Sequence, residues 1–131
     1  MITEDYCSQE VSKLLEEKGF REYCGAVYFI LENGDYSWSK IDIPIRDCGI
    51  CKPAAILCPT HQMAMKWLRE MYNIIIVIEP HMYDYVNERN ASYVCSIWVG
   101  DNYYENPTST DYTTFEETVD AALKHVLKNL I

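Results

Sequence analysis

Two pairs of residues with metal-ligand spacing stand close together in the chain, and their four members are Cys48, Cys51, Cys58 and His61. Structural zinc sites use thiolate and imidazole ligands, and they often draw them as two close pairs. Only six residues, KPAAIL, separate the two pairs here, whereas the pairs of zinc ribbons and zinc fingers lie further apart. This linker also lacks a glycine that would ease a tight reversal. We therefore predict no bound metal and no other cofactor, and we keep a zinc-binding module at these four residues as the alternative.

Cys58 and His61 could instead act as nucleophile and base, because a thiol near a helix N-terminus ionises more easily. The sequence shows no third group that would orient the histidine. Glu79 and His81 flank Pro80 at the end of a predicted strand, where a plain surface strand end is the simpler interpretation. The chain has no dinucleotide-binding glycine motif, phosphate-binding loop or HExxH motif. We expect a protein without enzymatic activity.

Acidic residues and tyrosines concentrate in the second half of the chain. The chain has 20 Asp and Glu against 11 Lys and Arg, for a net charge of −9, and Arg89 is the only Lys or Arg between Glu70 and Leu123. Nucleic acids and anionic membranes both require cations on their partner, so we predict neither as a partner. Phenol rings beside carboxylates suit an Arg- or Lys-bearing protein surface. The predicted partner-binding residues are Asp101, Tyr103, Tyr104 and Glu105.

The length of 131 residues suits one domain, which we expect to span residues 1–131. The start of the chain, MITEDYCSQEV, is acidic and polar and does not resemble a signal peptide. No apolar run reaches the length of a membrane span. We therefore expect a cytoplasmic protein, in which the six cysteines stay reduced.

The first half of the chain predicts a helix, a hairpin and an irregular segment. The helix stops at Gly19. The dipeptide Asn33-Gly34 between two apolar runs predicts a two-residue turn that places Phe29 opposite Trp38. Residues 42–59 contain three prolines and follow neither the helical nor the strand period.

The second half predicts two helices around a second pair of strands. A helix begins at Thr60, and the run IIIVI at residues 74–78 has the β-branched composition of a central strand. Residues 93–99 form the next strand, residues 101–113 a polar loop, and Thr114 caps the last helix. The order is α-β-β-α-β-β-α. We predict an α+β fold in which helices pack on one four-stranded, mainly antiparallel sheet.

The segment PTHQMAMKWLREMYNIIIVI, together with TFEETVDAALKHVLKNLI at the end, resembles a family of small uncharacterised proteins of gut Bacteroidetes, their phages and mobile elements. The resemblance implies a small α+β protein of mobile-element origin, and it implies no activity and no functional residue. Together with the residues above, it leads us to expect a non-enzymatic cytoplasmic accessory protein that binds another protein. A weaker alternative is an acidic decoy that occupies a nucleic-acid-binding protein.

Overall fold

The α+β class is confirmed, but the single four-stranded sheet is wrong. The computed structural model describes residues 5–41, 55–82 and 91–131. Within these residues the order is α-β-β-β-α-β-β-β-α, and the strands form two three-stranded antiparallel sheets. The chain divides into two compact units, Met1–Ala64 and Met65–Ile131. The expectation of one domain stays a prediction.

The first unit contains helix α1, Gln9–Glu17, which has a capped start and a sharp end. The side chain of Ser8 accepts a hydrogen bond from the N–H of Val11 over 3.2 Å. Gly19 has a φ of +97°, the left-handed conformation that ends many helices. The N–H of Phe20 then donates to the carbonyl of Leu15 over 2.9 Å, and the Phe20 ring is buried. The predicted helix stop at Gly19 is therefore confirmed.

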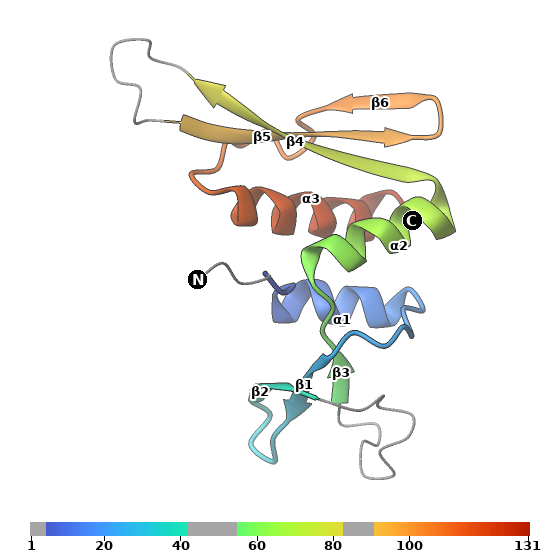
Figure 1. The fold of residues 1–131 in the computed structure, drawn as a ribbon, viewed down its shortest axis with the longest axis vertical. Helices are drawn as coiled ribbons and strands as arrows, with labels where there is room; N and C mark the ends of the chain where they lie inside the picture. The colour runs from blue at the N-terminus through green and yellow to red at the C-terminus, as the bar shows by residue number, and fades with distance from the viewer. Residues whose placement is uncertain (1–4, 42–54, 83–90) are drawn as a thin grey trace. The chain divides into compact units, whose positions relative to one another are not determined.

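The sheet of the first unit consists of β1 (Ala26–Ile30), β2 (Tyr36–Lys40) and β3 (Ala55–Leu57), in the order β2-β1-β3 (Figure 1). Strand β3 lies in the segment that the sequence predicted to be irregular. It pairs with β1 and contacts α1. This short strand is the third strand of the sheet in the first unit.

The pairing of β1 with β2 differs by one residue from the sequence prediction. Trp38 lies opposite Tyr28, whereas a two-residue turn would place it opposite Phe29. Side chains alternate between the two sides of a sheet, so Trp38 lies on the same side as Tyr28 and not on the side of Phe29. There its ring contacts that of Tyr6 edge to face, with 5.1 Å between centroids.

The cause of this shift is a longer hairpin loop. The N–H of Leu31 donates to the carbonyl of Asp35 over 2.7 Å, and the N–H of Gly34 donates to the carbonyl of Leu31 over 2.9 Å. Gly34 has a φ of +88°, while Asn33 is not among the residues with positive φ. The loop is therefore a three-residue turn with glycine in the left-handed position, which is the second common hairpin type.

Helix α2, His61–Tyr72, contains the boundary between the two units. The N–H of Met63 donates to the hydroxyl of Thr60 over 3.2 Å, so the predicted helix start at Thr60 is confirmed. Trp67 and Leu68 are buried, and Lys66 forms an exposed ion pair with Glu70.

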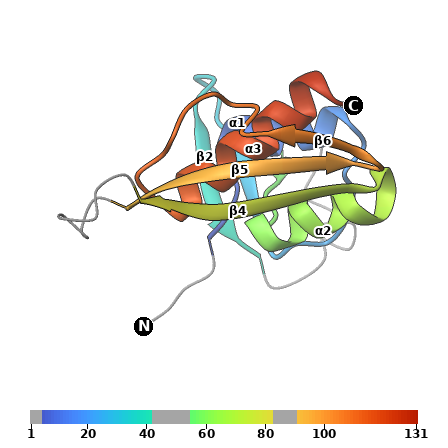
Figure 2. The same ribbon diagram turned by 90° about the horizontal axis from the view of Figure 1, so that it is seen from above.

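The second unit places helix α3, Phe115–Asn129, across one side of a sheet. The sheet contains β4 (Ile74–Met82), β5 (Ala91–Val99) and β6 (Asn102–Glu105), in the order β4-β5-β6. Figures 1 and 2 show α3 beneath this sheet. Thr114 caps α3 as predicted, by accepting from the N–H of Glu117 over 3.1 Å. The residues of α3 that are buried are Thr118, Val119, Ala122, Leu123, Val126 and Leu127.

Two sequence predictions for this unit are wrong. Among the strands of the described residues, the run IIIVI lies at an edge of its sheet, because the strand in the centre is β5. Part of the predicted polar loop 101–113 forms β6, joined to β5 through Gly100 and Asp101, where Gly100 has a φ of +59°. Among the helices of the described ranges, none combines the length and apolar character that crossing a membrane requires.

Candidate functional site

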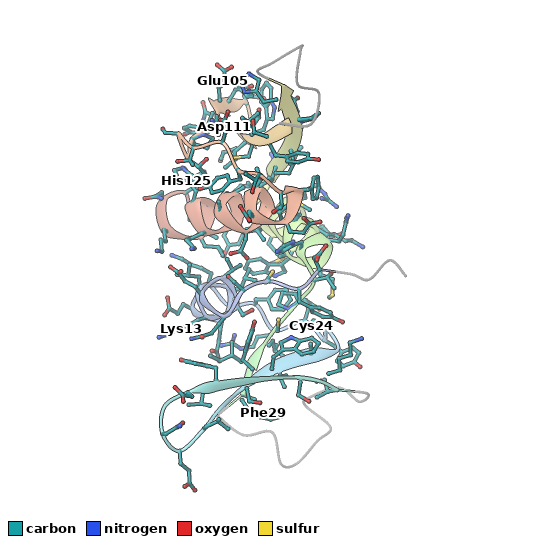
Figure 3. The ribbon with its side chains drawn as sticks, turned by 90° about the vertical axis from the view of Figure 1, so that its left-hand side faces the viewer. Lys13, Cys24, Phe29, Glu105, Asp111 and His125 are labelled. Atoms are coloured by element: carbon teal, nitrogen blue, oxygen red, sulfur yellow. The ribbon has the colours of Figure 1, made fainter. Side chains whose placement is uncertain are left out.

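The side of the β4-β5-β6 sheet that faces away from α3 is called the outer face here. Strand alternation and register define its ten residues, which are Ile75, Val77, Glu79, His81, Ser92, Val94, Ser96, Trp98, Tyr103 and Glu105. The opposite side carries Ile74, Cys95 and Ile97, each at most 1% exposed. Figure 3 shows Glu105 on the side of the sheet remote from His125 of α3. The helix thus covers one side of the sheet, and the outer face carries the functional candidates.

An exposed aromatic pair lies near the β5–β6 turn on the outer face. Trp98 and Tyr103 lie opposite each other, with their ring centroids 4.7 Å apart and their planes at 39°. Trp98 is 40% exposed and Tyr103 is 50% exposed. Ile75, opposite Trp98 on the other neighbour strand, is also exposed. The outer face thus carries three large side chains that are exposed to solvent, those of Trp98, Tyr103 and Ile75.

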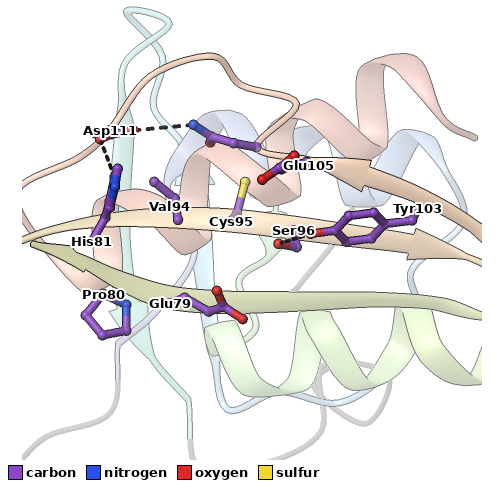
Figure 4. A pocket seen from close by; sticks show the side chains of 10 residues that line it. Glu79, Pro80, His81, Val94, Cys95, Ser96, Tyr103, Glu105 and Asp111 are labelled. Carbon is purple, nitrogen blue, oxygen red and sulfur yellow. Dashed lines mark hydrogen bonds and ion pairs between the residues drawn. The ribbon is translucent and has the colours of Figure 1, made fainter.

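A pocket of about 370 Å³ opens beside this aromatic pair (Figure 4). Its lining residues come from all three strands and from the segment after β6, and they are Glu79, Pro80, His81, Val94, Cys95, Ser96, Tyr103, Glu105, Asn106 and Asp111. The hydroxyls of Ser96 and Tyr103 are hydrogen-bonded over 3.2 Å. This bond ties the wall of the pocket to the aromatic pair.

Asp111 holds the segment after β6 against the end of β4. Its Oδ2 atom lies 3.2 Å from Nδ1 of His81, and its Oδ1 atom accepts from the Asn106 amide over 3.3 Å (Figure 4). A second link is the pair of backbone hydrogen bonds between Tyr93 and Tyr112. These contacts hold one rim of the pocket in place. Two of the pocket's carboxylates lie on this rim, Glu105 at the end of β6 and Asp111 in the segment that follows.

Two residues with nucleophile-type side chains, Cys95 and Ser96, are among the lining residues of the pocket. Burial raises the pKa of the Cys95 thiol, and hydrogen bonds to Thr108 only partly offset this effect. A thiol with a raised pKa is protonated at neutral pH and is a weak nucleophile. Ser96 is 8% exposed, its hydroxyl is hydrogen-bonded to that of Tyr103, and in Figure 4 the side chain lies apart from the ring of His81. The lining of the pocket thus offers charged and hydrogen-bonding groups to a ligand.

The structure separates the four residues that the sequence grouped as a partner site. Asp101 lies in the exposed β5–β6 turn, and the other three belong to β6. Tyr103 and Glu105 lie on the outer face, whereas Tyr104 pairs with Ile97 and lies on the opposite side. Two members of the predicted site thus share one surface, and Tyr104 does not belong to it.

The predicted metal ligands are only partly described. Cys48 and Cys51 lie outside the described residues, so the zinc alternative stays a prediction. Cys58 is fully buried, and its thiol donates to the carbonyl of Cys7 over 3.4 Å. His61 is 7% exposed. Within the described ranges, no group of three or more His, Cys, Asp or Glu side chains is placed to hold a metal ion.

Sequence reasoning missed Trp98, Ser96 and Asp111 as parts of the site. Alternation along YVCSIWV assigns Trp98 to the side opposite Cys95 and Ile97, so a strand with one buried side already predicts an exposed tryptophan. No sequence signal links Asp111 to His81, because 30 positions separate them and only the fold brings them together.

Comparison with known proteins does not extend this picture. The resemblance to the family from Bacteroidetes and their phages stays a prediction. A scan against protein-family models and searches of curated proteins and of solved structures found no match for the chain.

Proposed function

We propose that the chain is a non-enzymatic protein-binding module that recognises a basic segment of its partner through the outer face. The observation that carries this proposal is the exposed Trp98–Tyr103 pair beside an acidic pocket. Tryptophan and tyrosine offer a large rigid contact area with a polar tip, and both are enriched at the centres of protein interfaces.

Three carboxylates favour a cationic ligand group in the pocket. Glu79, Glu105 and Asp111 line it, and no Lys or Arg side chain is among its lining residues. A guanidinium group donates several hydrogen bonds at once and also stacks on aromatic rings. An arginine of the partner would therefore place its charge between the carboxylates while its planar group contacts Tyr103.

Binding without chemistry agrees with the state of the pocket thiol. The Cys95 side chain lies on the α3-facing side of the sheet, and burial raises its pKa, so this thiol stays protonated at neutral pH. The further proposal of an accessory role in a phage or mobile element rests on the sequence resemblance alone.

The experiment that tests this function starts from a partner captured with the tagged full-length chain. Its affinity is then measured by calorimetry for single variants of the outer face. Trp98→Ala and Tyr103→Ala should each weaken binding at least about tenfold, as expected for central aromatic anchors. Tyr104→Ala is the matched control, because it removes an equally sized ring that is 39% exposed on the opposite side. It should leave the affinity unchanged.

Two further measurements separate this proposal from its alternatives. The affinity should fall as salt rises, because exposed charges are screened within about 8 Å at physiological ionic strength. The double variant Cys48→Ser with Cys51→Ser should bind as the unaltered chain does. Equal losses in Tyr103→Ala and Tyr104→Ala, or a loss confined to the cysteine variant, would reject the outer face as the binding surface.

A further inference from the structure

Strand β4 forms an edge of its sheet, and its first half has the composition of a strand with neighbours on both sides. In the described residues β4 pairs with β5, and no strand pairs with its other edge. Residues 74–78 are all isoleucine or valine and carry no charge. Exposed edges in natural sheets are usually short, charged or interrupted. The edge strand β6 follows this rule, with four residues and Glu105 at its end.

The isolated pairing of Tyr93 with Tyr112 establishes which backbone groups point out of this edge. Tyr93 donates to and accepts from Tyr112, so both of its backbone groups point away from β4. Pro80 lies opposite Tyr93 in β4, and the ladder between them therefore has no hydrogen bonds at this pair. Because the pattern alternates, Ile75, Val77 and Glu79 bond to β5. The residues whose backbone groups point out of the edge are Ile74, Ile76, Ile78 and Pro80.

The free edge thus offers three N–H donors, at Ile74, Ile76 and Ile78, and ends at Pro80, which has none. Prolines at the outer edge cost no ladder bond and stop further pairing. An added strand can therefore pair along residues 74–78, next to the exposed side chain of Ile75.

The position of α2 favours an extended partner segment, rather than a second copy of the chain, as the strand that pairs with the free edge of β4. Viewed from above, the helix follows β4 and projects beyond it on the side away from β5 (Figure 2). A single strand added at this edge would have α2 below it, as α3 lies below β5. A second copy paired through its own β4 would place its α2 on the same side of the joined sheet as the first, so two helices would have to share the side that a single added strand leaves to one. The edge therefore suits an extended segment rather than a second copy.

We infer that the free edge of β4 takes an extended segment of the partner as an additional strand, an inference that rests on the protein-binding function proposed above. Side chains of such a strand alternate between the two sides of the sheet. In the added strand, the apolar side chains point toward α2. The basic side chains lie on the same side of the sheet as the outer face, next to Glu79. The partner segment is therefore an extended run that alternates apolar and basic residues.

The test uses a synthetic peptide of about seven residues that alternates arginine and valine, the pattern required for strand addition. Amide hydrogen exchange of the full-length chain is measured by NMR with and without this peptide. In the free chain the amides of Ile76 and Ile78 should exchange at least about tenfold faster than those of Ile75 and Val77, because they lack a strand partner. The peptide should protect the first pair and leave the second unchanged.

Two N-methylated versions of the peptide serve as matched controls, with methyl groups on alternate residues in opposite phases. Both keep every side chain, but one loses the N–H groups that face β4. That version should bind at least about tenfold more weakly, whereas the other should bind as the unmodified peptide does. Equal binding of the two versions, or no binding at millimolar peptide, would overturn the inference.

The variant Ile76→Pro removes an outward N–H and leaves the bonds to β5 in place. Its folded state is checked by thermal unfolding, and it should weaken the peptide and the captured partner alike. If Trp98→Ala weakens the partner but Ile76→Pro does not, the outer face binds without strand addition, and the inference fails while the proposed function stands. Sedimentation showing a dimer that dissociates in Ile76→Pro would assign the edge to a second copy and would also overturn the inference.

Discussion

Trp98 and Tyr103 face each other directly across the β5–β6 hairpin, with 4.7 Å between their ring centroids. Tyr93 bonds on the β6 side of β5, so by alternation Trp98 and Tyr103 form a pair without backbone hydrogen bonds. Side chains approach most closely at such pairs. The two rings therefore support each other in the free protein, and the surface that we propose for binding is ordered before the partner arrives.

This contact predicts a measurable coupling between the two rings. A double-mutant cycle of Trp98→Ala and Tyr103→Ala, followed by denaturant unfolding, should give an interaction of about 0.5–1 kcal/mol. The cycle of Trp98→Ala with Tyr104→Ala is the control, because Tyr104 lies on the other side of the sheet. Its coupling should be close to zero, and equal values for the two cycles would contradict the pairing described here.

The hairpin loop predicts a specific cost at Gly34. Its φ of +88° is strained for residues with a Cβ atom and worst for a β-branched one. Gly34→Val should lower the free energy of unfolding by roughly 1–2 kcal/mol. Gly34→Asn is the control, since asparagine tolerates the left-handed region, and it should cost clearly less. Thermal unfolding of both variants checks this, and equal losses would show that strain at φ is not the cause.

The same hairpin shows what the sequence could and could not predict. Asn33-Gly34 correctly located the reversal, because glycine is needed where φ is positive. The loop length remained open, since two- and three-residue loops both use glycine there. The one-residue difference moved Trp38 from Phe29 to Tyr28. Local turn chemistry therefore located the element but did not determine its register.

Strand order was harder to predict than strand existence. The run at residues 74–78 identified β4, but its composition indicated a central strand and the fold places it at an edge. Position in a sheet depends on pairing with distant residues, which composition does not encode. The ion pair of His81 with Asp111 has the same origin in the fold. The sequence predicted Tyr103 and Glu105 as site residues because exposed aromatic and acidic side chains are a local property.

Ser12 predicts a gain in stability on truncation. The residue is fully buried in α1, and its hydroxyl lacks a hydrogen-bond partner in the described part of the chain. Ser12→Ala removes this unsatisfied group and raises helix propensity, so the free energy of unfolding should rise by about 0.5–1 kcal/mol. Ser8→Ala is the same change at the helix cap and should instead cost about 1 kcal/mol. Denaturant unfolding of both variants should thus give opposite signs; a loss in Ser12→Ala would mean that its hydroxyl has a partner.

Metal content remains a prediction from the spacing of the cysteine pairs. We expect protein purified without chelator to hold far less than one zinc per chain, as measured by inductively coupled plasma mass spectrometry. If about one zinc per chain is found, as structural sites would hold, Cys51→Ser should remove it and Cys95→Ser should retain it. That result would replace our expectation with the zinc-binding alternative at Cys48, Cys51, Cys58 and His61.

The Cys24 thiol predicts how the first unit responds to alkaline pH. Burial raises its pKa from the ordinary value near 9 to about 11, and Figure 3 shows the side chain inside this unit. Between these values the unfolded chain releases the proton and the folded chain retains it, so stability is complete below pH 9 and falls as pH rises to 11. The loss reaches on the order of 2–3 kcal/mol, because each pKa unit is worth about 1.4 kcal/mol.

Other groups also titrate in this range, so the measurement is the difference between two chains. Unfolding free energies of the unaltered protein and of Cys24→Ala are compared from pH 8 to pH 11. The variant should start less stable, because it loses buried contacts, and its stability should fall less steeply above pH 9, because the buried thiol is gone. Cys95→Ala should change the slope in the same direction, since burial also raises the pKa of Cys95. Parallel curves for the unaltered chain and Cys24→Ala would mean that Cys24 does not retain its proton more tightly in the folded state than in the unfolded one.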